Sequence, residues 1–358
     1  MKKKSIISIS IALAVCLTIL WLLQALLMPK YMSESKEGAL IAEYYNEAGG
    51  NDVIFIGDCE VYENFSPITL YEEYGITSYI RGSAQQLIWQ SYYLMEETFK
   101  YETPKVMVFN VLSMKYDTPE STGNSGHREA YNRMNIDGMR WSMSKWNSIN
   151  ASLTEEEIEK ESQWSYLFPI LRYHDRWSQL TEEDFKYIFS RDEVSDNGYL
   201  MQVGIKPLTA EHVEKPIADY TFADNCWDYL NKMKDLCEKN GTELVLIKAP
   251  SLSPVWWDEW DAQIEEYAKE NGLLYINFLE HQEEIGIDWS KDTYDTGLHL
   301  NVYGAEKLSL YFGKILKENF DLEDYRKNTE ASALWTEKVN EYNERKTLLE
   351  KKETVKNK

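Results

Sequence analysis

Cysteine, histidine and proline are scarce in this chain of 358 residues, which contains four cysteines, five histidines and nine prolines. Four cysteines are too few for the disulfide scaffold that stabilises many small secreted domains. Cys226 and Cys237 fall on one predicted helix, about 16 Å of rise apart. Because a disulfide bridges Cα atoms no more than roughly 7 Å apart, we expect both to be core thiols. The position of Cys59 needs a different explanation.

Motifs for metals, phosphates and nucleic acids are also missing. His127, His174, His212 and His281 are scattered without the spacing of a zinc site, so no metal is predicted. No Gly-rich phosphate loop of the Walker type occurs, and no cofactor is expected. Basic residues number 38 against 60 acidic ones, for a net charge of −22. Nucleic acid is therefore not an expected partner, because nucleic-acid binding draws its affinity from Lys and Arg.

Ser5–Met28 runs for 24 residues without a charge. Lysines occupy positions 2–4 before it, and Lys30 follows it. At 1.5 Å per residue, such a helix spans a hydrocarbon core of roughly 30 Å. The lysine cluster favours a cytoplasmic N-terminus. We predict a single-pass cell-membrane protein whose lipid-bilayer contact is Ser5–Met28 and whose C-terminal domain is extracytoplasmic.

Two other interpretations of this N-terminal segment compete. A cleaved signal peptide would have an apolar region of about 7–15 residues followed by a small-residue cleavage site. The run here is longer, and Leu26, Leu27 and Met28 offer no such site. Leu13-Ala14-Val15-Cys16 is superficially like a lipoprotein cleavage box, but Val15 is a poor fit and the apolar run continues for twelve more residues. We therefore favour an uncleaved signal anchor.

Beyond the anchor, short apolar runs alternate with helical patterns. The runs typical of buried strands are Val53–Ile56, Ile76–Ile80, Val106–Phe109, Glu243–Ile247 and Leu273–Ile276. The helical stretches between and after them begin at Ser66-Pro67, Ala84, Phe222, Asp258 and Val302, the last extending to Phe320. This alternation predicts a parallel sheet with crossover helices.

The remaining segments have other compositions. Residues 31–50 carry a helical pattern stopped by Gly49-Gly50, which predicts a stalk helix between the anchor (1–30) and the main domain (51–320). Residues from about 113 to 221 predict a largely helical insertion over the strand ends, as a lid or substrate-shaping subdomain. Residues 321–358 are dense in charge and predict either a solvated helix or a disordered tail, with disorder favoured beyond Lys346.

Polar residues follow the predicted strands at the points where the strands end. The first strand is followed by Gly57-Asp58-Cys59, the second by Gly82 and the third by Asn110. Asp295 and His299 precede the last helix. Because the carboxyl ends of parallel strands meet at one edge of a sheet, we expect these residues to lie together.

This arrangement resembles the SGNH/GDSL hydrolase superfamily. Gly57-Asp58-Cys59 is similar to its first block, normally Gly-Asp-Ser, and Gly82 and Asn110 match its second and third blocks. The stretch from Asp295 to Gly304 resembles its last block. The resemblance covers about residues 52–111 and 222–320. It implies an α/β fold of three layers, flavodoxin-like, with a parallel sheet of about five strands. The helical insertion and the one N-terminal transmembrane helix lie outside the resemblance and are predicted from their own residues.

The resemblance also implies roles for these residues. Cys59 would be the nucleophile, His299 its base and Asp295 the acid that orients the imidazole. Gly82 and Asn110 would contribute to the oxyanion hole. The sequence departs from the family in two places. Cysteine replaces serine at position 59, and the acid stands four rather than three residues before His299, which leaves Asp292 as an alternative.

Each of these residues also has a structural interpretation. A lone cysteine after a strand is more often a core thiol, a lone histidine a surface or capping residue, and Asn110 could cap a turn. Asp58, Trp256 and Trp257 are candidate substrate-binding residues, the tryptophans as a sugar-stacking platform. Trp256 and Trp260 stand at helical spacing, however, which is also typical of a packed face.

The function that follows is a membrane-anchored esterase or O-acyltransferase of the cell envelope. By resemblance, its substrate is an acylated glycan or another ester-bearing polymer, and a multi-pass membrane acyltransferase is an expected partner. The alternative is a catalytically inactive scaffold that binds glycan or that acyltransferase. Glu60 beside Cys59 would disfavour thiolate formation if its carboxylate faced the sulfur. A papain-like or sortase-like peptidase is disfavoured, because its Cys and His do not usually sit on this strand–helix order.

Overall fold

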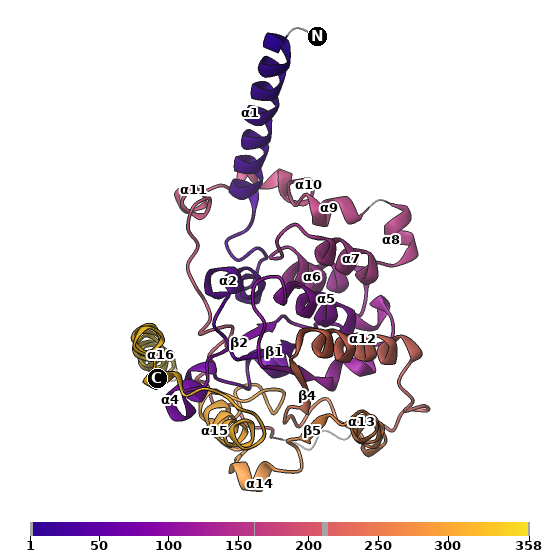
Figure 1. Ribbon diagram of the computed structural model, residues 1–358, viewed down its shortest axis with the longest axis vertical. Coiled ribbons are helices and arrows are strands. Elements are labelled where there is room, and N and C mark those ends of the chain that lie inside the picture. Colours follow the sequence, from indigo (N-terminus) through magenta and orange to yellow (C-terminus); the bar gives the residue numbers. More distant parts are fainter. Residues whose placement is uncertain (1–2, 161, 210–213, 357–358) are drawn as a thin grey trace.

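A computed structural model describes residues 3–160, 162–209 and 214–356 (Figure 1). Lys2 and His212 lie outside these residues. Within them, five parallel strands form one sheet in the order β2-β1-β3-β4-β5. The strands are β1 (Val53–Gly57), β2 (Ser78–Gly82), β3 (Val106–Asn110), β4 (Glu243–Lys248) and β5 (Leu274–Asn277). This is the flavodoxin-like strand order, and it confirms the predicted α/β fold with a five-stranded parallel sheet.

The strands form where apolar runs can be covered on both faces of the sheet. Every residue of β1, β2 and β3 is buried, as is typical of parallel sheets with helices on either side. Successive side chains point to opposite faces. Phe55 packs in one face against Phe65 and Phe312, with ring centroids 5.2 and 5.9 Å away. Ile54 and Ile56 join the core on the other face.

Helices cover the two faces of the sheet and complete three layers (Figure 1). One face is covered by α4 (Pro67–Tyr74) and α15 (Val302–Asn319), which pack against each other. The other is covered by α5 (Ile88–Thr98), α12 (Asp224–Asn240) and α13 (Asp258–Asn271). The predicted start and end of α4 are confirmed, because the Ser66 hydroxyl accepts a bond from Thr69 N and Gly75 adopts the left-handed conformation at φ 69°.

The N-terminal helix α1 spans Lys3–Leu27. Its segment Ser5–Leu27 is long and apolar enough to cross a membrane. Its side chains project from the domain, and only the foot of the helix at Leu27 and Met28 is buried. The side of the membrane on which the domain lies stays a prediction.

Residues 31–50 do not form the separate stalk that the sequence predicts. A 3-10 turn at Lys36–Ala39 leads into the short helix α2 (Leu40–Glu47), which packs against β2. Leu40, Ile41 and Tyr44 are fully buried. The Tyr44 ring centroid lies 3.9 Å from the guanidinium carbon of Arg81 in β2. An amphipathic helix of eight residues gains more by burying this face on the domain than by standing free in water.

The insertion between β3 and α12 contains several short helices. They are α6 (Ser125–Ile136), α7 (Met143–Ser152), α8 (Glu155–Glu159), α9 (Gln163–Leu167), α10 (Ile170–Tyr173) and α11 (Glu182–Tyr187), with 3-10 turns at Val111–Lys115, Pro119–Thr122 and His174–Ser178. Thr181 and Asp184 form a capping pair at the start of α11. Helices α10 and α11 lie at the foot of α1, and α9 packs beside α10 (Figure 1), so these helices are not the cover over the strand ends that we expected.

The return segment of the insertion is the part that reaches the strand ends. Asn197 covers the edge strand β2, since its carbonyl accepts a 3.0 Å bond from Ile80 N. Leu200 N donates to Tyr62 O at 2.8 Å, and Lys206 N donates to Thr293 O at 2.9 Å. Residues 195–206 thus connect the sheet edge to the loop before α15. A lid function for the insertion stays a prediction.

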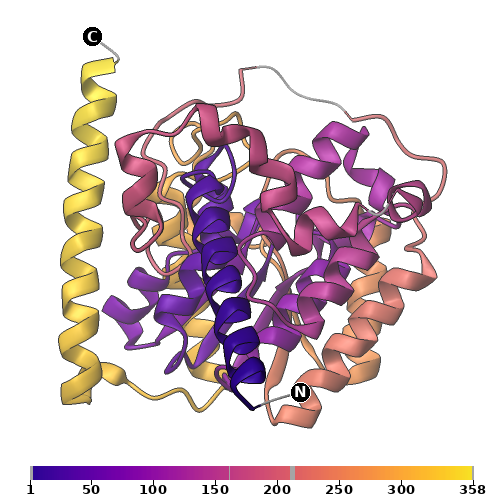
Figure 2. The same cartoon turned by 90° about the horizontal axis from the view of Figure 1, so that it is seen from above.

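The C-terminal segment is ordered where disorder was expected beyond Lys346. It forms α16 (Thr329–Lys356), a long helix along one side of the domain (Figure 2). Trp335 stacks on Tyr71 of α4 at 4.8 Å between ring centroids, and Tyr342 is only 2% exposed. Leu349 also packs against this core. These three residues recur every seven positions, which places them on one face of the helix. The surrounding charges conceal this sparse apolar face in the sequence.

The packing of α16 predicts different costs for two substitutions on the same helix. Trp335→Ala removes a side chain that is 4% exposed, whereas Leu348→Ala truncates one that is 52% exposed. We expect Trp335→Ala to lower the free energy of unfolding by about 3–5 kcal/mol and Leu348→Ala by less than about 0.5 kcal/mol. Urea denaturation of the full-length protein measures both values. Equal effects would show that α16 does not pack on the domain.

Candidate active site

Cys59 stands at the carboxyl edge of the sheet because β1 ends in a tight turn. Asp58 caps the short helix α3 (Cys59–Tyr62), and its Oδ1 accepts a 3.1 Å bond from Glu60 N. Gly57 is required here, since a Cβ at this position would lie 2.5 Å from Val61 Cγ2. Cys59 is a free, partly buried thiol. The predicted strand–turn geometry therefore holds.

A hydrogen-bonded loop before α15 positions His299. Thr293 and Leu300 form an isolated antiparallel bridge, and Thr293 Oγ1 accepts a 2.9 Å bond from Gly297 N. Asp295 Oδ1 accepts the backbone N–H of His299 at 2.9 Å. The same carboxylate can therefore use its second oxygen for the ring. The backbone geometry of the loop makes the four-residue spacing of Asp295 and His299 work.

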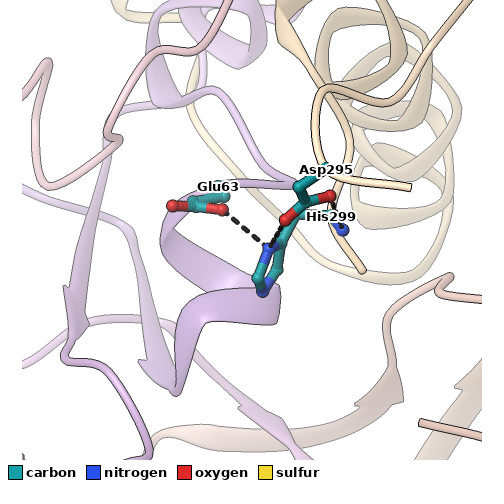
Figure 3. A group of neighbouring side chains, drawn as sticks. All are labelled: Glu63, Asp295 and His299. Atoms are coloured by element: carbon teal, nitrogen blue, oxygen red, sulfur yellow. Dashed lines mark hydrogen bonds and ion pairs between the residues drawn. The ribbon is translucent and has the colours of Figure 1, made fainter. Parts of the chain in front are cut away.

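The imidazole of His299 lies against two carboxylates (Figure 3). Its Nδ1 is 2.6 Å from Asp295 Oδ2 and 3.0 Å from Glu63 Oε2. Tyr294 OH donates to the same Glu63 oxygen at 2.5 Å, which fixes that carboxylate. Asp292, the alternative acid, pairs instead with Lys307 at 2.6 Å. Asp295 is thus the predicted acid that faces His299, and Glu63 is a second one.

The Cys59 thiol lies close enough to the His299 side chain for each to shift the pKa of the other: His299 lowers the pKa of Cys59, and Cys59 raises that of His299. Because the carboxylates occupy Nδ1, Nε2 is the ring nitrogen left for the sulfur. The structure therefore brings the predicted Cys59, His299 and Asp295 together. Sequence reasoning missed Glu63. Its signal was present, since it stands four residues after Cys59 and so on the same side of a helical turn.

The surroundings shift the pKa values of both Cys59 and His299. Burial disfavours the His299 cation, but the Cys59 charge and the hydrogen bonds to Asp295, Cys59 and Glu63 outweigh it, so the pKa of His299 lies well above 6.5. Burial, with the charge of Asp58, raises the pKa of Cys59 to about 11, although His299 offsets part of this rise. Both shifts favour the protonated forms, a thiol at Cys59 and an imidazolium at His299.

Asn110 is held inside the protein by three polar groups. Its Nδ2 donates to Asp58 Oδ1 at 3.3 Å and to Glu60 Oε2 at 3.1 Å, while its Oδ1 accepts from Ala249 N at 3.1 Å. Both amide protons are therefore committed to carboxylates in this structure. The predicted role of Asn110 in an oxyanion hole requires at least one of these bonds to break.

Gly82 lies beside Gly57 at the ends of β2 and β1. A Cβ on Gly82 would lie 2.9 Å from Gly57 O and 3.2 Å from Tyr62 Cδ1. Close packing of the two strand ends thus explains why this position has no side chain. The part of the Gly82 backbone N–H in an oxyanion hole stays a prediction.

A buried ion pair lies next to Asn110, and sequence reasoning missed it. Lys248 ends β4 with no exposed surface, and its Nζ lies 2.8 Å from Glu60 Oε2. Ser251 Oγ donates to the other Glu60 oxygen at 2.8 Å. The ion pair holds the Glu60 carboxylate toward β4. Among the acidic side chains, Asp58 is the one whose charge raises the pKa of Cys59 most. Asp58 is itself affected, since burial and the charge of Glu60 raise its pKa to about 6.

Trp256 and Trp257, which follow β4, pack against neighbouring side chains and do not form an open binding surface. Trp256 is 7% exposed, and its Nε1 donates to Asp261 Oδ1 at 2.9 Å. Its ring stacks on Phe222 with centroids 6.1 Å apart, and Trp257 packs edge-on against Tyr220 at 5.5 Å. The sugar-stacking platform that we considered for Trp256 is therefore wrong. Its helical spacing with Trp260 indicates a core face, as the alternative had it.

Glu63, Asp295 and His299 could also hold a metal ion. Their ligand atoms all lie within 4.8 Å of one another. One imidazole nitrogen and two carboxylate oxygens are donors that zinc takes, so our expectation of no metal had not considered this group. The hydrogen bonds among the three side chains explain their arrangement without an ion.

Comparisons with known proteins add little to this geometry. No protein family model matches the chain, and no curated protein sequence matches it. Among solved structures, a Bacteroides fragilis NCTC 9343 protein described as a "putative acylhydrolase" aligns with 77% of this chain and 94% of its own, at 13% identity and a TM-score of 0.38. This likeness concerns the fold alone.

The raised pKa of His299 predicts how stability depends on pH. A group whose pKa is raised by folding stabilises the folded state fully below its unfolded pKa, about 6.5 for histidine, and this contribution is lost as the pH rises through the folded value. The difference in unfolding free energy between the wild type and His299→Gln should therefore be largest below about pH 6.5 and should shrink at higher pH. Urea denaturation of the full-length proteins across pH measures it, and a difference that grows with pH would contradict the assignment.

Proposed function

We propose that this protein is a membrane-anchored esterase or O-acyltransferase with Cys59 as its nucleophile. The observation that carries the proposal is the contact of His299 Nδ1 with Asp295 and Glu63, beside a Cys59 thiol near enough for it and His299 to shift each other's pKa. A nucleophile, a base and an orienting acid in sequential contact are the arrangement used for acyl transfer on several unrelated folds. The location at the carboxyl edge of a parallel sheet is where such folds bind ligands.

The reaction divides into two acyl transfers. Neutral His299 takes the proton from Cys59, and the thiolate attacks the ester carbonyl carbon. The C–O bond then breaks, and the leaving alcohol receives the proton from His299, leaving an acyl thioester on Cys59. Water or an acceptor hydroxyl next gives its proton to His299 and attacks the thioester, which returns the thiol and releases an acid or a new ester. Asp295 and Glu63 stabilise the imidazolium in both steps.

The negative charge that develops on the carbonyl oxygen needs donors. We assign the backbone N–H groups of Cys59 and Gly82 to this role, as the family resemblance implies. Losing one such donor typically costs ~100- to 1,000-fold in rate. Asn110 joins them only when its amide leaves Asp58 or Glu60.

The substrate and location follow from the anchor and the resemblance together. Ser5–Leu27 would hold the domain at a membrane, and the lysines before it favour an extracytoplasmic domain. Membrane-tethered members of the SGNH/GDSL superfamily act on acyl groups of envelope polymers. We therefore propose an acylated cell-envelope glycan or polymer as substrate, with a membrane acyltransferase as partner.

A second function, a catalytically inactive scaffold, has its own supporting observation. The pKa of Cys59 is raised to about 11, and that of His299 is also raised, so both shifts oppose the thiolate and free-base forms that the reaction uses. Asn110 is engaged by carboxylates as well. Such a site would bind an acylated glycan or a partner acyltransferase without turning it over.

Hydrolysis of aryl acetates and aryl thioesters by the full-length protein in detergent separates the two functions. We expect Cys59→Ala to reduce hydrolysis to the uncatalysed background, and His299→Gln to reduce it by ~100- to 10,000-fold, the usual range for general acid–base catalysis. Cys16→Ala, in α1, is the matched control and should leave the rate unchanged.

Two results would overturn the proposed chemistry. Hydrolysis that persists in Cys59→Ala would exclude this thiol as the nucleophile. A wild type without activity that gains it on Cys59→Ser would instead support the scaffold. For an active wild type, kcat/KM should rise with pH above neutrality, because His299 must lose its proton before it can accept the one from Cys59.

A further inference from the structure

The foot of α1 is enclosed by the insertion. Helix α1 contacts α10, the 3-10 turn His174–Ser178 and α11, and Figure 1 shows these elements around its lower end. Leu27 and Met28 are 7% and 6% exposed, while Leu20 and Trp21 are more than half exposed. The helix therefore changes from exposed to buried within about two turns.

The length of α1 places this change at the bilayer boundary. A span needs about 20 apolar residues to cross a hydrocarbon core of roughly 30 Å. The apolar segment Ser5–Leu27 has 23 residues, so it has little length to spare. If it spans, the hydrocarbon must end close to Leu27. The elements that pack around Leu27 then lie at the level of the lipid headgroups.

Two arginines tie the insertion to the end of α1. Arg176 Nη1 donates to Leu27 O at 2.6 Å, and Arg191 Nη1 donates to Pro29 O at 2.6 Å. Carbonyl groups at a helix C-terminus lack hydrogen-bond donors within the helix. The guanidinium groups of Arg176 and Arg191 act as such donors at the end of α1. Arg176 also bonds Asp184 of α11 at 2.9 Å. The position of α10 and α11 relative to α1 is therefore held by side-chain hydrogen bonds as well as by packing.

The elements around the foot of α1 carry large exposed apolar side chains. Leu171 on α10 is 55% exposed, Trp177 in the 3-10 turn 71%, Phe185 on α11 55% and Phe189 just after it 80%. We call these four residues the juxtamembrane surface. Apolar residues gathered on a surface indicate an interaction site, and aromatic residues are enriched where proteins meet the membrane–water interface.

The charge of this region also fits a bilayer. Residues 164–191 contain four basic and four acidic side chains, whereas the whole chain has a net charge of −22. An acidic surface would be repelled by anionic headgroups, and this neutral one is not. Arg176 and Arg191 add cations at the expected headgroup level.

We propose that the juxtamembrane surface inserts into the interface of the leaflet that faces the domain. This rests on the membrane anchor of the proposed function. The insertion is then a second membrane contact beside α1, and it limits rotation of the domain about the anchor. It thereby sets the direction in which the site with Cys59 and His299 faces relative to the bilayer.

Tryptophan quenching in vesicles tests the proposal with the full-length protein. The vesicles are phosphatidylcholine–phosphatidylglycerol bilayers that carry a nitroxide either on the lipid headgroup or near the middle of the acyl chain. Trp177→Phe should remove part of the headgroup-level quenching. Trp21→Phe should remove part of the mid-chain quenching, because Trp21 lies about 9 Å along the helix from Leu27.

Trp289→Phe is the control. The Trp289 indole donates to Gln282 of α14 (Gln282–Ile285) at 2.5 Å, and α14 lies at the end of the molecule opposite α1 (Figure 1). This change should leave both quenching signals unaltered. All three substitutions keep an aromatic ring, and Trp177 is 71% exposed, so a folding defect is not expected there.

The outcomes distinguish the surface from the anchor. Loss of headgroup-level quenching in Trp177→Phe alone, with mid-chain loss in Trp21→Phe, supports the proposal. Mid-chain loss in Trp21→Phe with no change in Trp177→Phe would overturn the juxtamembrane surface, leave the anchor intact and assign these residues to a protein contact. No loss in either variant would overturn the surface and the anchor together. Ester hydrolysis, assayed separately in detergent, is unaffected by any of these results.

Discussion

The candidate site depends on the contact of His299 Nδ1 with two carboxylates. Glu63 comes from the turn after β1, whereas Asp295 and His299 come from the loop before α15, more than 230 residues later in the chain. The interaction therefore joins the first strand of the sheet to the last helix of the domain. It also directs the remaining ring nitrogen toward Cys59. If either carboxylate were displaced, both the orientation and the charge of the imidazole would change.

The same contact sets the chemical state of the site. Two acids at one ring nitrogen stabilise the imidazolium that forms when Cys59 loses its proton to His299, which favours catalysis. They also raise the pKa of His299, which opposes the free-base form. The edge contains the further acids Asp58 and Glu60, and only Glu60 has a buried lysine partner at contact distance. Acyl transfer at this site would be faster if a bound substrate displaced water and thereby changed the pKa values of these groups.

Much of the fold was predictable from local sequence patterns. β1 and β3, the ends of α4 and the last long helices follow apolar periodicity, N-caps and glycines, all of which are local signals. The predictions that failed did so because of packing contacts that form only in the folded chain. The stalk prediction missed that Tyr44 packs on Arg81 in β2, and the disorder predicted after Lys346 missed an apolar face of one residue per two helical turns. Trp256 was predicted as a candidate binding residue because its hydrogen bond to Asp261 can be seen only in the structure.

The candidate site was predictable in part, through its order along the chain. Cys59, Asp295 and His299 were predicted from their order along the chain, and the structure places Asp295 against His299. Glu63 and Lys248 do not belong to that pattern, and their partners are far away in sequence. Intact and peptide mass spectrometry after a brief reaction with an aryl acetate tests the central claim most directly. The account predicts one acetyl group on the Cys59 peptide of the wild type and a much slower appearance in His299→Gln. Acetylation elsewhere, or at the same rate in His299→Gln, would contradict it.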